Sequence, residues 1–424
     1  MANFDQPDTG TDAVLTTVDG TPLKQALALA MRRARINAFL LVLPLLLFVV
    51  VTFAVPIGQM LYLSIHSPVF SDHMPRLTAY LKDHPDVGVP GEEGFEALAL
   101  DLADAKKNRT MGRIGTRVNY DRAGSNSLFK SGARKAAKFK GPPYKEQLLN
   151  HREDWGELHL WNVMRRAAQA HTPDFYAAAL DFTYDAGGGL VRVDPERQIY
   201  VMLYMRTFFL SALIAGLCLL LGFPVAHLLA TLPLRYSNLL MIFVLLPFWT
   251  SLLVRTTSWI SLLQSQGVLN DLLVSTGIIG DDGRVQMMYN QYGTIIAMTH
   301  ILLPFMILPL YSVMKTIPPS YVRAARSLGA TPFTAFIKVY FPQTVPGIGA
   351  GTLLVFILAI GYYITPALVG GSSGELISNQ IAFHMQRSLN WSLAAALGAI
   401  LLFGVLGLYW LYDRLIGVDN MKFG

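Results

Sequence analysis

Side chains that could carry chemistry are few in this 424-residue chain, and they stand apart from one another. Cys218 is the single cysteine and lies in an apolar run, so the chain alone can form neither a disulfide nor a thiolate metal site. His227 and His300 also lie in apolar runs, with no carboxylate nearby in the sequence. A proton relay would need such acids, so we interpret both histidines as hydrogen-bonding partners between packed helices.

Motifs for nucleotide and metal binding are absent from the sequence. It contains no G-x-x-x-x-G-K-[ST] phosphate loop, no H-E-x-x-H and no C-x-x-C spacing. Arg255 follows a long uncharged run, where it either ends a membrane helix with its guanidinium at the surface or is buried against a partner. We therefore predict that the chain is not an enzyme and that it holds no metal and no cofactor of its own.

The overall composition is that of a membrane protein. Hydrophobic residues make up 53% of the chain and charged residues only 15%, and the mean hydropathy is +0.40. The net charge of +6 does not identify an anionic partner, because 19 of the 34 Lys and Arg residues fall in 66–200 beside 18 acidic residues.

Six apolar stretches are long enough to cross a hydrocarbon core as helices, which takes about 20 residues each. None alternates in the manner of a barrel strand, so helices are predicted. The stretches are Ile36–Ile65, Thr207–Leu234, Tyr236–Val254, Val285–Met314, Val339–Gly374 and Ser388–Tyr412. Pro224, Pro247 and Pro366 are candidate breaks where a pathway could bend.

The positions of Lys and Arg close to the spans predict the orientation. The cations share one side of the membrane, which we expect to be cytoplasmic; they are Arg32, Arg33, Arg35, Arg235, Lys315, Arg323, Arg326 and Lys338. Both termini would then be cytoplasmic, and 66–200 would lie outside. The first apolar run is too long and starts too late for a cleaved signal peptide. Thr21–Arg35 is either an interfacial helix or a solvated lead-in.

The 66–200 segment is too long for a simple loop, so we expect it to fold. Gly91–Arg109 and Trp155–Phe182 show the helical spacing of apolar residues. Between them, Lys106–Lys145 carries twelve Lys and Arg residues against Asp121 alone. We interpret this stretch as a solvated loop, with docking to an acidic partner or to lipid as the alternative. The predicted topology argues against nucleic acid.

The segment Pro318–Gly347 carries clear helix punctuation. Ser320 can cap a short helix that Gly329 ends in a left-handed conformation. Thr331 can cap a second helix that Pro332 opens and Pro342 interrupts. Two short helices of this kind form a compact protrusion, a shape that can dock into a cleft on another protein.

The same segment resembles the cytoplasmic signature of the inner-membrane permeases of type I ABC importers. That signature is Glu-Ala-Ala, three residues, Gly, nine residues, Ile, one residue and Leu-Pro. The corresponding residues here are Arg323, Ala324, Ala325, Gly329, Val339, Phe341 and Pro342. The spacing is kept throughout, whereas Arg323 replaces the usual carboxylate, and Val339 and Phe341 occupy the Ile and Leu positions.

Over 200–420 the chain resembles permeases of the spermidine/putrescine importer group. The resemblance is carried by LLGFPVAHLLA at 220–230, PFWTSLLVRTTSWI at 247–260, GVLND at 267–271 and GYYITPALVGG at 361–371. It implies an all-α membrane protein with six transmembrane helices of the type I importer permease fold. A large extracytoplasmic insert would separate helices 1 and 2, in the position of the extra periplasmic domain of the large maltose permease.

This resemblance implies a division of the chain. The expected parts are a cytoplasmic N-terminal segment (1–35), helix 1 (36–65), the insert (66–200), a five-helix core (201–418) with coupling helices at 318–342, and a cytoplasmic tail (419–424).

Partner subunits are implied as well. ATP and Mg²⁺ would bind to two cytoplasmic ATPase subunits, and the importer would also need a second permease, expected to be a different chain, and a periplasmic solute-binding protein. The segment 321–342 would transmit ATPase closure to the spans within the bacterial inner membrane. The expected coupling residues are Arg323, Ala324, Ala325, Leu328, Gly329 and Pro342.

A cationic solute such as a polyamine would require carboxylates or aromatic faces along its path. The six apolar cores contain no Asp or Glu, so aromatic residues and a helix break are the candidates. The candidates are Trp249, Trp259, Tyr362, Tyr363 and Pro366, although packing or interfacial roles would also account for them.

Other solutes and other classes remain alternatives at this stage. Related permeases carry opines, amino-acid-like solutes, iron or oxyanions. An ion-coupled secondary transporter would show intramembrane acids and internal repeats, and neither is found. A membrane receptor would account for the insert, but not for the cytoplasmic signature.

Overall fold

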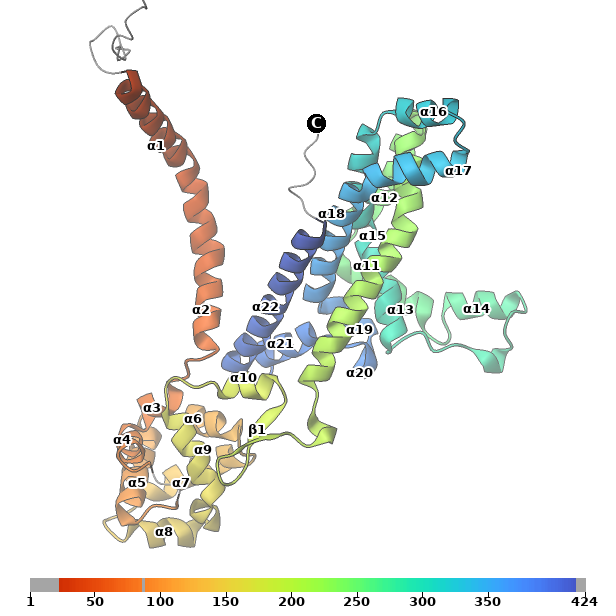
Figure 1. Cartoon of the computed structure of the whole chain (residues 1–424). Coiled ribbons are helices and arrows are strands. Elements are labelled where there is room, and N and C mark those ends of the chain that lie inside the picture. Colours follow the sequence, from red (N-terminus) through yellow and green to blue (C-terminus); the bar gives the residue numbers. More distant parts are fainter. Residues whose placement is uncertain (1–22, 86–87, 417–424) are drawn as a thin grey trace, which may run out of the picture. The chain divides into compact units, whose positions relative to one another are not determined.

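Residues 23–85 and 88–416 are described by a computed structural model and are almost entirely helical (Figure 1). They divide into two units, Met1–Met60 and Leu61–Gly424, and each is described by itself. The predicted tail 419–424 and the beginning of the N-terminal segment lie outside the described residues.

The first unit consists of the helix that carries the first predicted span. The helix runs through α1 (Leu23–Val49), a π-helical turn η1 (Val50–Ala54) and α2 (Val55–Leu63), whose last residues belong to the second unit. Met31–Leu63 is apolar and long enough to cross a membrane. The lead-in before Arg35 is helical from Leu23 onward and is continuous with the span.

The 66–200 segment folds mainly as short helices. Its elements are α3 (Val69–His73), α4 (Pro75–Asp83), α5 (Glu92–Lys107), α6 (Met111–Asn119), α7 (Ser125–Ala136), α8 (Tyr144–His151), η2 (Glu153–Gly156), α9 (Leu158–Ala168), α10 (Asp174–Ala179), β1 (Phe182–Tyr184), β2 (Leu190–Arg192) and η3 (Pro195–Arg197). The expectation of a solvated loop over Lys106–Lys145 was wrong. Apolar residues recur there at helical spacing and are buried, such as Ile114 and Val118 on α6 and Leu128 on α7.

A hydrophobic core of its own holds this segment together. Phe95 on α5, Phe129 on α7 and the two tryptophans Trp155 and Trp161 are fully buried in it. The Trp161 indole N–H donates to the Trp155 carbonyl at 2.8 Å, which satisfies its one polar atom.

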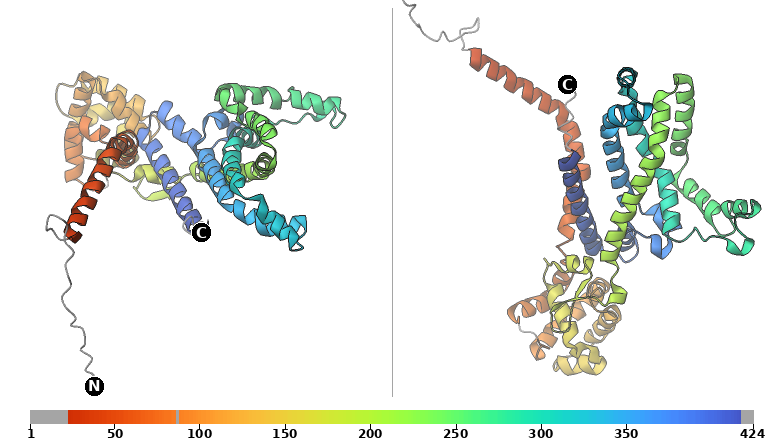
Figure 2. Two further views of the ribbon diagram at one scale, coloured as in Figure 1. Left: turned by 90° about the horizontal axis from the view of Figure 1, so that it is seen from above. Right: turned by 45° about the vertical axis from the view of Figure 1, so that its right-hand side comes forward.

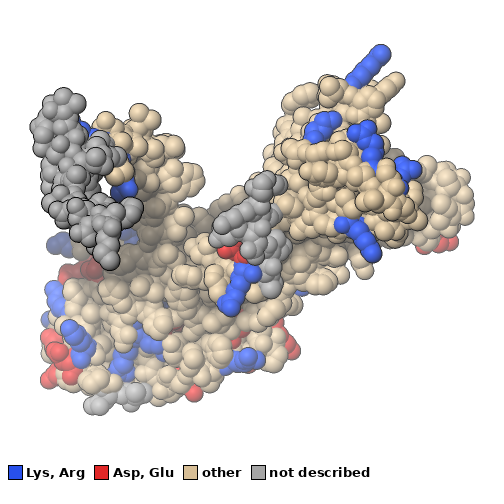
Figure 3. All heavy atoms as spheres, turned by 45° about the horizontal axis from the view of Figure 1, so that its top comes forward, with Lys and Arg blue, Asp and Glu red and all other residues tan. Residues whose placement is uncertain are grey.

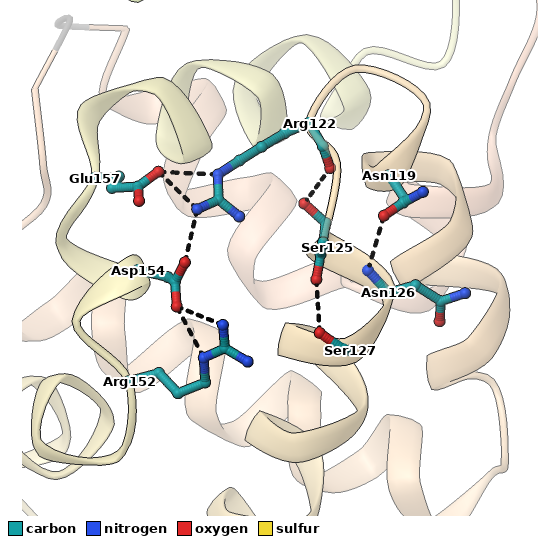
Figure 4. Close-up of polar contacts among 9 residues, drawn as sticks. Asn119, Arg122, Ser125, Asn126, Ser127, Arg152, Asp154 and Glu157 are labelled. Atoms are coloured by element: carbon teal, nitrogen blue, oxygen red, sulfur yellow. Dashed lines mark hydrogen bonds and ion pairs between the residues drawn. The ribbon is translucent and has the colours of Figure 1, made fainter.

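Ion pairs tie η2 and the residue before α9 to the turn before α7 (Figure 4). The Arg122 guanidinium contacts Glu157 at 2.7 Å and Asp154 at 2.9 Å, and Arg152 contacts the other oxygen of Asp154 at 2.8 Å. Hydrogen bonds from Arg122, and then from Arg152, hold the pKa of Asp154 below its ordinary value.

A short β-hairpin connects the 66–200 segment to α11, and the carboxylate of Asp181 caps the start of that helix. Strands β1 and β2 pair antiparallel, with Phe182 opposite Arg192. Asp181, buried just before β1, accepts the backbone N–H groups of Ile199 and Tyr200 on Oδ1 and of Val201 on Oδ2. The carboxylate therefore satisfies the first turn of the following helix and lies at the positive end of its dipole.

The remaining elements form the membrane part of the chain. They are α11 (Tyr200–Thr231), α12 (Leu234–Leu245), η4 (Leu246–Trp249), α13 (Leu252–Leu263), α14 (Val268–Ser275), η5 (Asp281–Gly283), α15 (Gln291–Thr316), α16 (Pro319–Ser327), α17 (Pro332–Ala335), the π-helix η6 (Phe336–Tyr340), α18 (Phe341–Gly361), α19 (Ile364–Val369), α20 (Gly371–Gly374), α21 (Ile377–Gln386) and α22 (Trp391–Ile416). Figure 2 shows these helices from two further sides.

Helices α11, α15 and α18 pack around the core of the membrane part, which includes Cys218 and Met306. Small residues let α18 approach α15 closely. A Cβ at Gly351 would lie 2.7 Å from the Met306 sulfur, and one at Gly347 would lie 3.3 Å from the Leu310 Cα. The two glycines are four residues apart, the spacing at which membrane helices pack backbone against backbone.

The described residues contain five helices suited to cross a membrane, or six if a bent pair is one span. The bent pair, Leu234–Trp249 and Leu252–Ser275, turns by 98°, so the predicted continuous span Tyr236–Val254 was wrong. Ser251 starts a new helix there, because its Oγ accepts the N–H of Val254.

The other spans match their predicted cores with changed ends. The helix predicted over Val339–Gly374 already ends at Gly361, and the chain then forms α19 and α20. Pro247 lies in η4 just before the bend, whereas Pro224 lies inside an unbroken α11.

Candidate coupling segment and substrate pathway

The first helix of the predicted coupling segment, α16, ends at Ser327, and Gly329 lies in the left-handed position after its C-cap Leu328. The Gly329 φ is +89°, its N–H donates to the Arg326 carbonyl, and the Ala330 N–H donates to the Ala325 carbonyl, both at 3.0 Å. These two bonds and the left-handed glycine are the Schellman ending of a helix. The predicted end of α16 is therefore present.

The start of α16 differs from the prediction. The helix begins at Pro319 with Pro318 as its N-cap residue, and Ser320 makes no cap. A proline in the first turn needs no N–H partner and already has a helical φ, so α16 starts two residues earlier than predicted.

The second helix begins as predicted but does not end at Pro342. Thr331 Oγ1 accepts the Thr334 N–H at 3.2 Å, and Pro332 opens α17. The helix then widens into η6 and continues as α18 through Pro342. Proline removes one backbone donor and crowds the preceding turn, and a π-helical turn at that place accommodates the change.

The coupling segment presents an exposed apolar tip and cations. Leu328 is 89% exposed and Phe333 is 75% exposed. Arg323 is exposed and forms no ion pair among the described residues. Lys and Arg side chains gather over the end of the molecule that carries α16 and α17 (Figures 1 and 3), and 285–374 contains no Asp or Glu. The surface combines large apolar side chains with positive charge, as docking surfaces do.

An aromatic cluster that the sequence reasoning missed joins this segment to α11. His227 Nδ1 lies 3.0 Å from the Tyr340 hydroxyl, and the His227 ring contacts Phe336 and Tyr340 edge-on. Phe223, one turn before His227, packs against Phe336 and Phe341. The signal was the i, i+4 spacing of Phe223 and His227 and of Phe336 and Tyr340, which places each pair on one helix face. The prediction that His227 bonds between helices is confirmed.

Some of the predicted pathway residues lie at neighbouring positions. The Trp259 indole N–H donates to His300 Nδ1 at 3.1 Å, which links α13 to α15. Arg255 lies on the same helix, α13, one turn before Trp259. Arg255 Nε is buried and has no hydrogen-bond partner among the described residues.

The other pathway candidates have distinct surroundings. Tyr362 and Tyr363 form the break between α18 and α19, where their carbonyls accept Ser378 Oγ at 2.6 Å and Asn379 Nδ2 at 2.9 Å. Pro366 is buried in α19. Trp249 ends η4, is 75% exposed and takes part in none of the ring contacts of the described residues. No geometry tests their role in transport, which stays a prediction.

The stretch GVLND has a structural use. Asn270 is fully buried; its amide donates to the Gln264 and Val285 carbonyls and accepts the Val285 N–H. Asp271 pairs with Arg284 at 2.8 Å. Together they close the loop after α14. Among the residues 23–85 and 88–416, no three His, Cys, Asp or Glu side chains are grouped to hold a metal ion.

Comparison with known families identifies the class. Residues 219–416 match the family described as binding-protein-dependent transport system inner membrane component. The spermidine/putrescine transport system permease protein PotB of Escherichia coli (strain K12) is 40% identical over 210 residues, which are 48% of this chain and 75% of that protein. PotB of Haemophilus influenzae is 34% identical over 224 residues, which are 53% of this chain and 78% of that protein.

A bacterial ABC transporter involved in the import of the acidic polysaccharide alginate aligns with a TM-score of 0.43 at 20% identity, covering 53% of this chain and 80% of that one.

The helices, their apolar lengths and the sequence relatives define an inner-membrane, multi-pass transport component without catalytic function. The chain belongs to the family of binding-protein-dependent transport system inner membrane components and is the permease of an ABC importer. The resemblance noted from its sequence is thereby confirmed.

Proposed function

We propose that this permease passes a polyamine of the spermidine/putrescine type across the inner membrane. The observation that carries the proposal is the 40% identity to the spermidine/putrescine permease of Escherichia coli over most of that protein. The family match at 219–416 begins within α11 and extends through α22, and it includes the helix break at Tyr362. A molybdenum permease of Mycobacterium bovis is also related, but at 28% identity.

Aromatic faces rather than carboxylates would contact the solute. The candidates are Trp249, Trp259, Tyr362 and Tyr363, with Pro366 at the break between α18 and α19. A cation over an aromatic ring gains about 0.5–2 kcal/mol, enough to favour passage without trapping the solute. Tyr363 is 38% exposed in this structure, so its ring is open to a solute.

The α16–α17 protrusion is proposed to dock a cytoplasmic ATPase subunit. Leu328 and Phe333 would enter an apolar cleft, and Gly329 would hold the turn between them. Arg323, Ala324 and Ala325 would face the rim. This end carries cations and no acids, and Arg323 stands where the family signature has a carboxylate. The facing part of the ATPase cleft is therefore expected to be acidic.

Movement of the docked protrusion would reach the spans through η6 and α18. Phe336 and Tyr340 contact α11 at His227, and α18 continues from η6 through Pro342 without a break. ATP-driven closure of two ATPase subunits would thus shift α11 and α18 together. A second permease subunit would complete the pathway.

The 66–200 segment is proposed to be an extracytoplasmic insert. The first support is the position of this segment just before the start of α11, because the far end of α11, at Ala230, contacts Lys315 beside the cationic protrusion. The second support is the positive-inside rule, applied to Arg32, Arg235 and Lys315. Both termini would then be cytoplasmic. A periplasmic solute-binding protein would meet the same side of the membrane.

Uptake by cells tests the polyamine assignment. The chain and its neighbouring importer subunits are expressed in bacteria that lack their own polyamine importers, and uptake of labelled spermidine is measured. We expect ATP-dependent uptake that unlabelled putrescine reduces and that glutamate does not. Normal assembly and ATP hydrolysis without any spermidine or putrescine uptake would exclude the polyamine assignment.

A further inference from the structure

A cavity of about 610 Å³ lies where the 66–200 segment meets the start of α22. On one side it is lined by residues at the end of α2 and in the 66–200 segment, including Leu63, Arg113 and Arg117. On the other side it is lined by residues around the start of α22, including Leu389 and Trp391. The Tyr120 hydroxyl bridges the two parts, donating to the Leu389 carbonyl at 3.3 Å. The volume is that of a small-molecule site, and most of the lining is apolar.

The charged side chains in the cavity wall are arginines. The lining contains Arg113 and Arg117 and no Asp or Glu. Arg117 is paired with Asp121 at 2.7 Å, but Arg113 forms no ion pair among the described residues. The cavity therefore has an excess of positive charge beside an apolar surface, and it would repel a polyamine.

Buried polar atoms in the wall have no partner. Arg117 is only 3% exposed, and its Nε makes no hydrogen bond among the described residues. His66 Nδ1 is also buried without a partner. An unpaired buried donor costs about 1–3 kcal/mol, and an anionic oxygen in the cavity would satisfy it.

The cavity lies beside the ends of two helices that are long and apolar enough to cross a membrane. Helix α22 begins at Trp391 and crosses as the span Trp391–Arg414, and the first span ends at Leu63. Tryptophan is typical of the headgroup level, and Trp391 is 46% exposed. The first turn of α22 adds the positive end of a helix dipole.

We propose that this cavity binds the headgroup of an anionic phospholipid. Its phosphate would lie between Arg113 and Arg117, and its acyl chains would follow the apolar beginning of α22. The bound lipid would fill the junction between the 66–200 segment and the membrane helices.

Native mass spectrometry of the full-length, delipidated chain in detergent tests the proposal. Phosphatidylglycerol, phosphatidylcholine and inorganic phosphate are titrated separately. We expect one phosphatidylglycerol molecule to bind at least tenfold more tightly than phosphatidylcholine, and inorganic phosphate not to bind at lipid concentrations. Arg113→Gln should weaken phosphatidylglycerol about tenfold, the loss of one charged hydrogen bond.

Lys130→Gln is the matched control, because Lys130 is an exposed cation on α7 outside the cavity. It should change phosphatidylglycerol affinity less than twofold. Arg113 is exposed, so its replacement leaves the fold intact, which the unfolding temperature checks. Equal weakening by both variants, or equal binding of the two lipids, would overturn the proposal. Arg113-dependent binding of inorganic phosphate alone would replace it with a simple anion site.

Discussion

At the scale of single residues, Gly329 and Tyr340 are central to the proposed coupling of the ATPase to the membrane helices. Gly329 has a left-handed backbone and open space around its Cα, so only the backbone conformation requires glycine there. Tyr340 is buried and reaches His227 on α11. The first residue sets the shape of the docking tip, and the second links that tip to a membrane helix.

Replacement of Gly329 should act through backbone strain alone. Gly329→Val is expected to cost about 1–2 kcal/mol, because a β-branched residue strongly disfavours the left-handed region. In the assembled importer, solute-stimulated ATP hydrolysis should fall severalfold. Gly329→Asn is the control, since asparagine tolerates this conformation, and it should retain most of the activity. Equal activity of the valine and asparagine variants would contradict this account.

The sequence predicted Gly329 and Thr331 because helix ends depend on local residues. It did not predict the contact between His227 and Tyr340, because 113 positions separate the two residues and only the packing of η6 on α11 brings them together. Ser320 was a wrong cap for a local reason: two prolines precede it, and the second one already opens the helix.

At the scale of elements, the junctions are more informative than the helices. Asp181 joins the 66–200 segment to α11, and the broken helix at Ser251 redirects the chain between α12 and α13. The pattern of apolar residues predicted neither feature. The uncharged run 236–254 continues across the bend at Ser251, so it gave no sign of a break there. The helices of Lys106–Lys145 were missed because charged residues dominate their exposed faces.

The Asp181 cap should stabilise the first turn of α11. Asp181→Asn removes the charge and one acceptor, at an expected cost of about 1 kcal/mol. Hydrogen exchange of the amides at 199–201 should become about fivefold faster. Asp194→Asn is the control, because Asp194 is exposed and caps no helix with its side chain. The same acceleration in both variants would show that Asp181 has no special role.

The Arg122–Asp154 pair predicts a pH dependence. Because the pKa of Asp154 is lowered in the folded chain, its contribution is present above about pH 4, the unfolded value, and is lost as the pH falls through the folded value. Asp154→Asn should lower the unfolding temperature at pH 7 by about 1–2 °C, as expected for a partly exposed pair.

That difference should be smaller at pH 3 than at pH 7, because protonation of the wild-type carboxylate removes the ion pair as the pH falls through the folded pKa. Glu153→Gln, an exposed neighbour without an ion pair among the described residues, should lower the unfolding temperature at neither pH. A gap between wild type and Asp154→Asn that is as large at pH 3 as at pH 7 would rule out the ion pair as its cause.

At the scale of the whole molecule, the apolar lengths alone predicted a polytopic membrane protein, because each span must exceed a fixed thickness. The spacing around Gly329 predicted the family before any comparison. The fold of 66–200 could not be predicted in detail, since its core depends on contacts such as Phe129 with Trp155 that are far apart in the sequence.

The central claim is that ATP energy reaches a polyamine pathway through α16 and α17. The most direct measurement is labelled spermidine uptake into proteoliposomes that contain the complete importer, with ATP supplied on the ATPase side. The account predicts ATP-dependent uptake that Leu328→Asp reduces at least tenfold, whereas Tyr292→Phe, an exposed change at the far end of α15, has no effect. Uptake that is unchanged in Leu328→Asp, or complete absence of spermidine uptake by an importer that hydrolyses ATP normally, would contradict it.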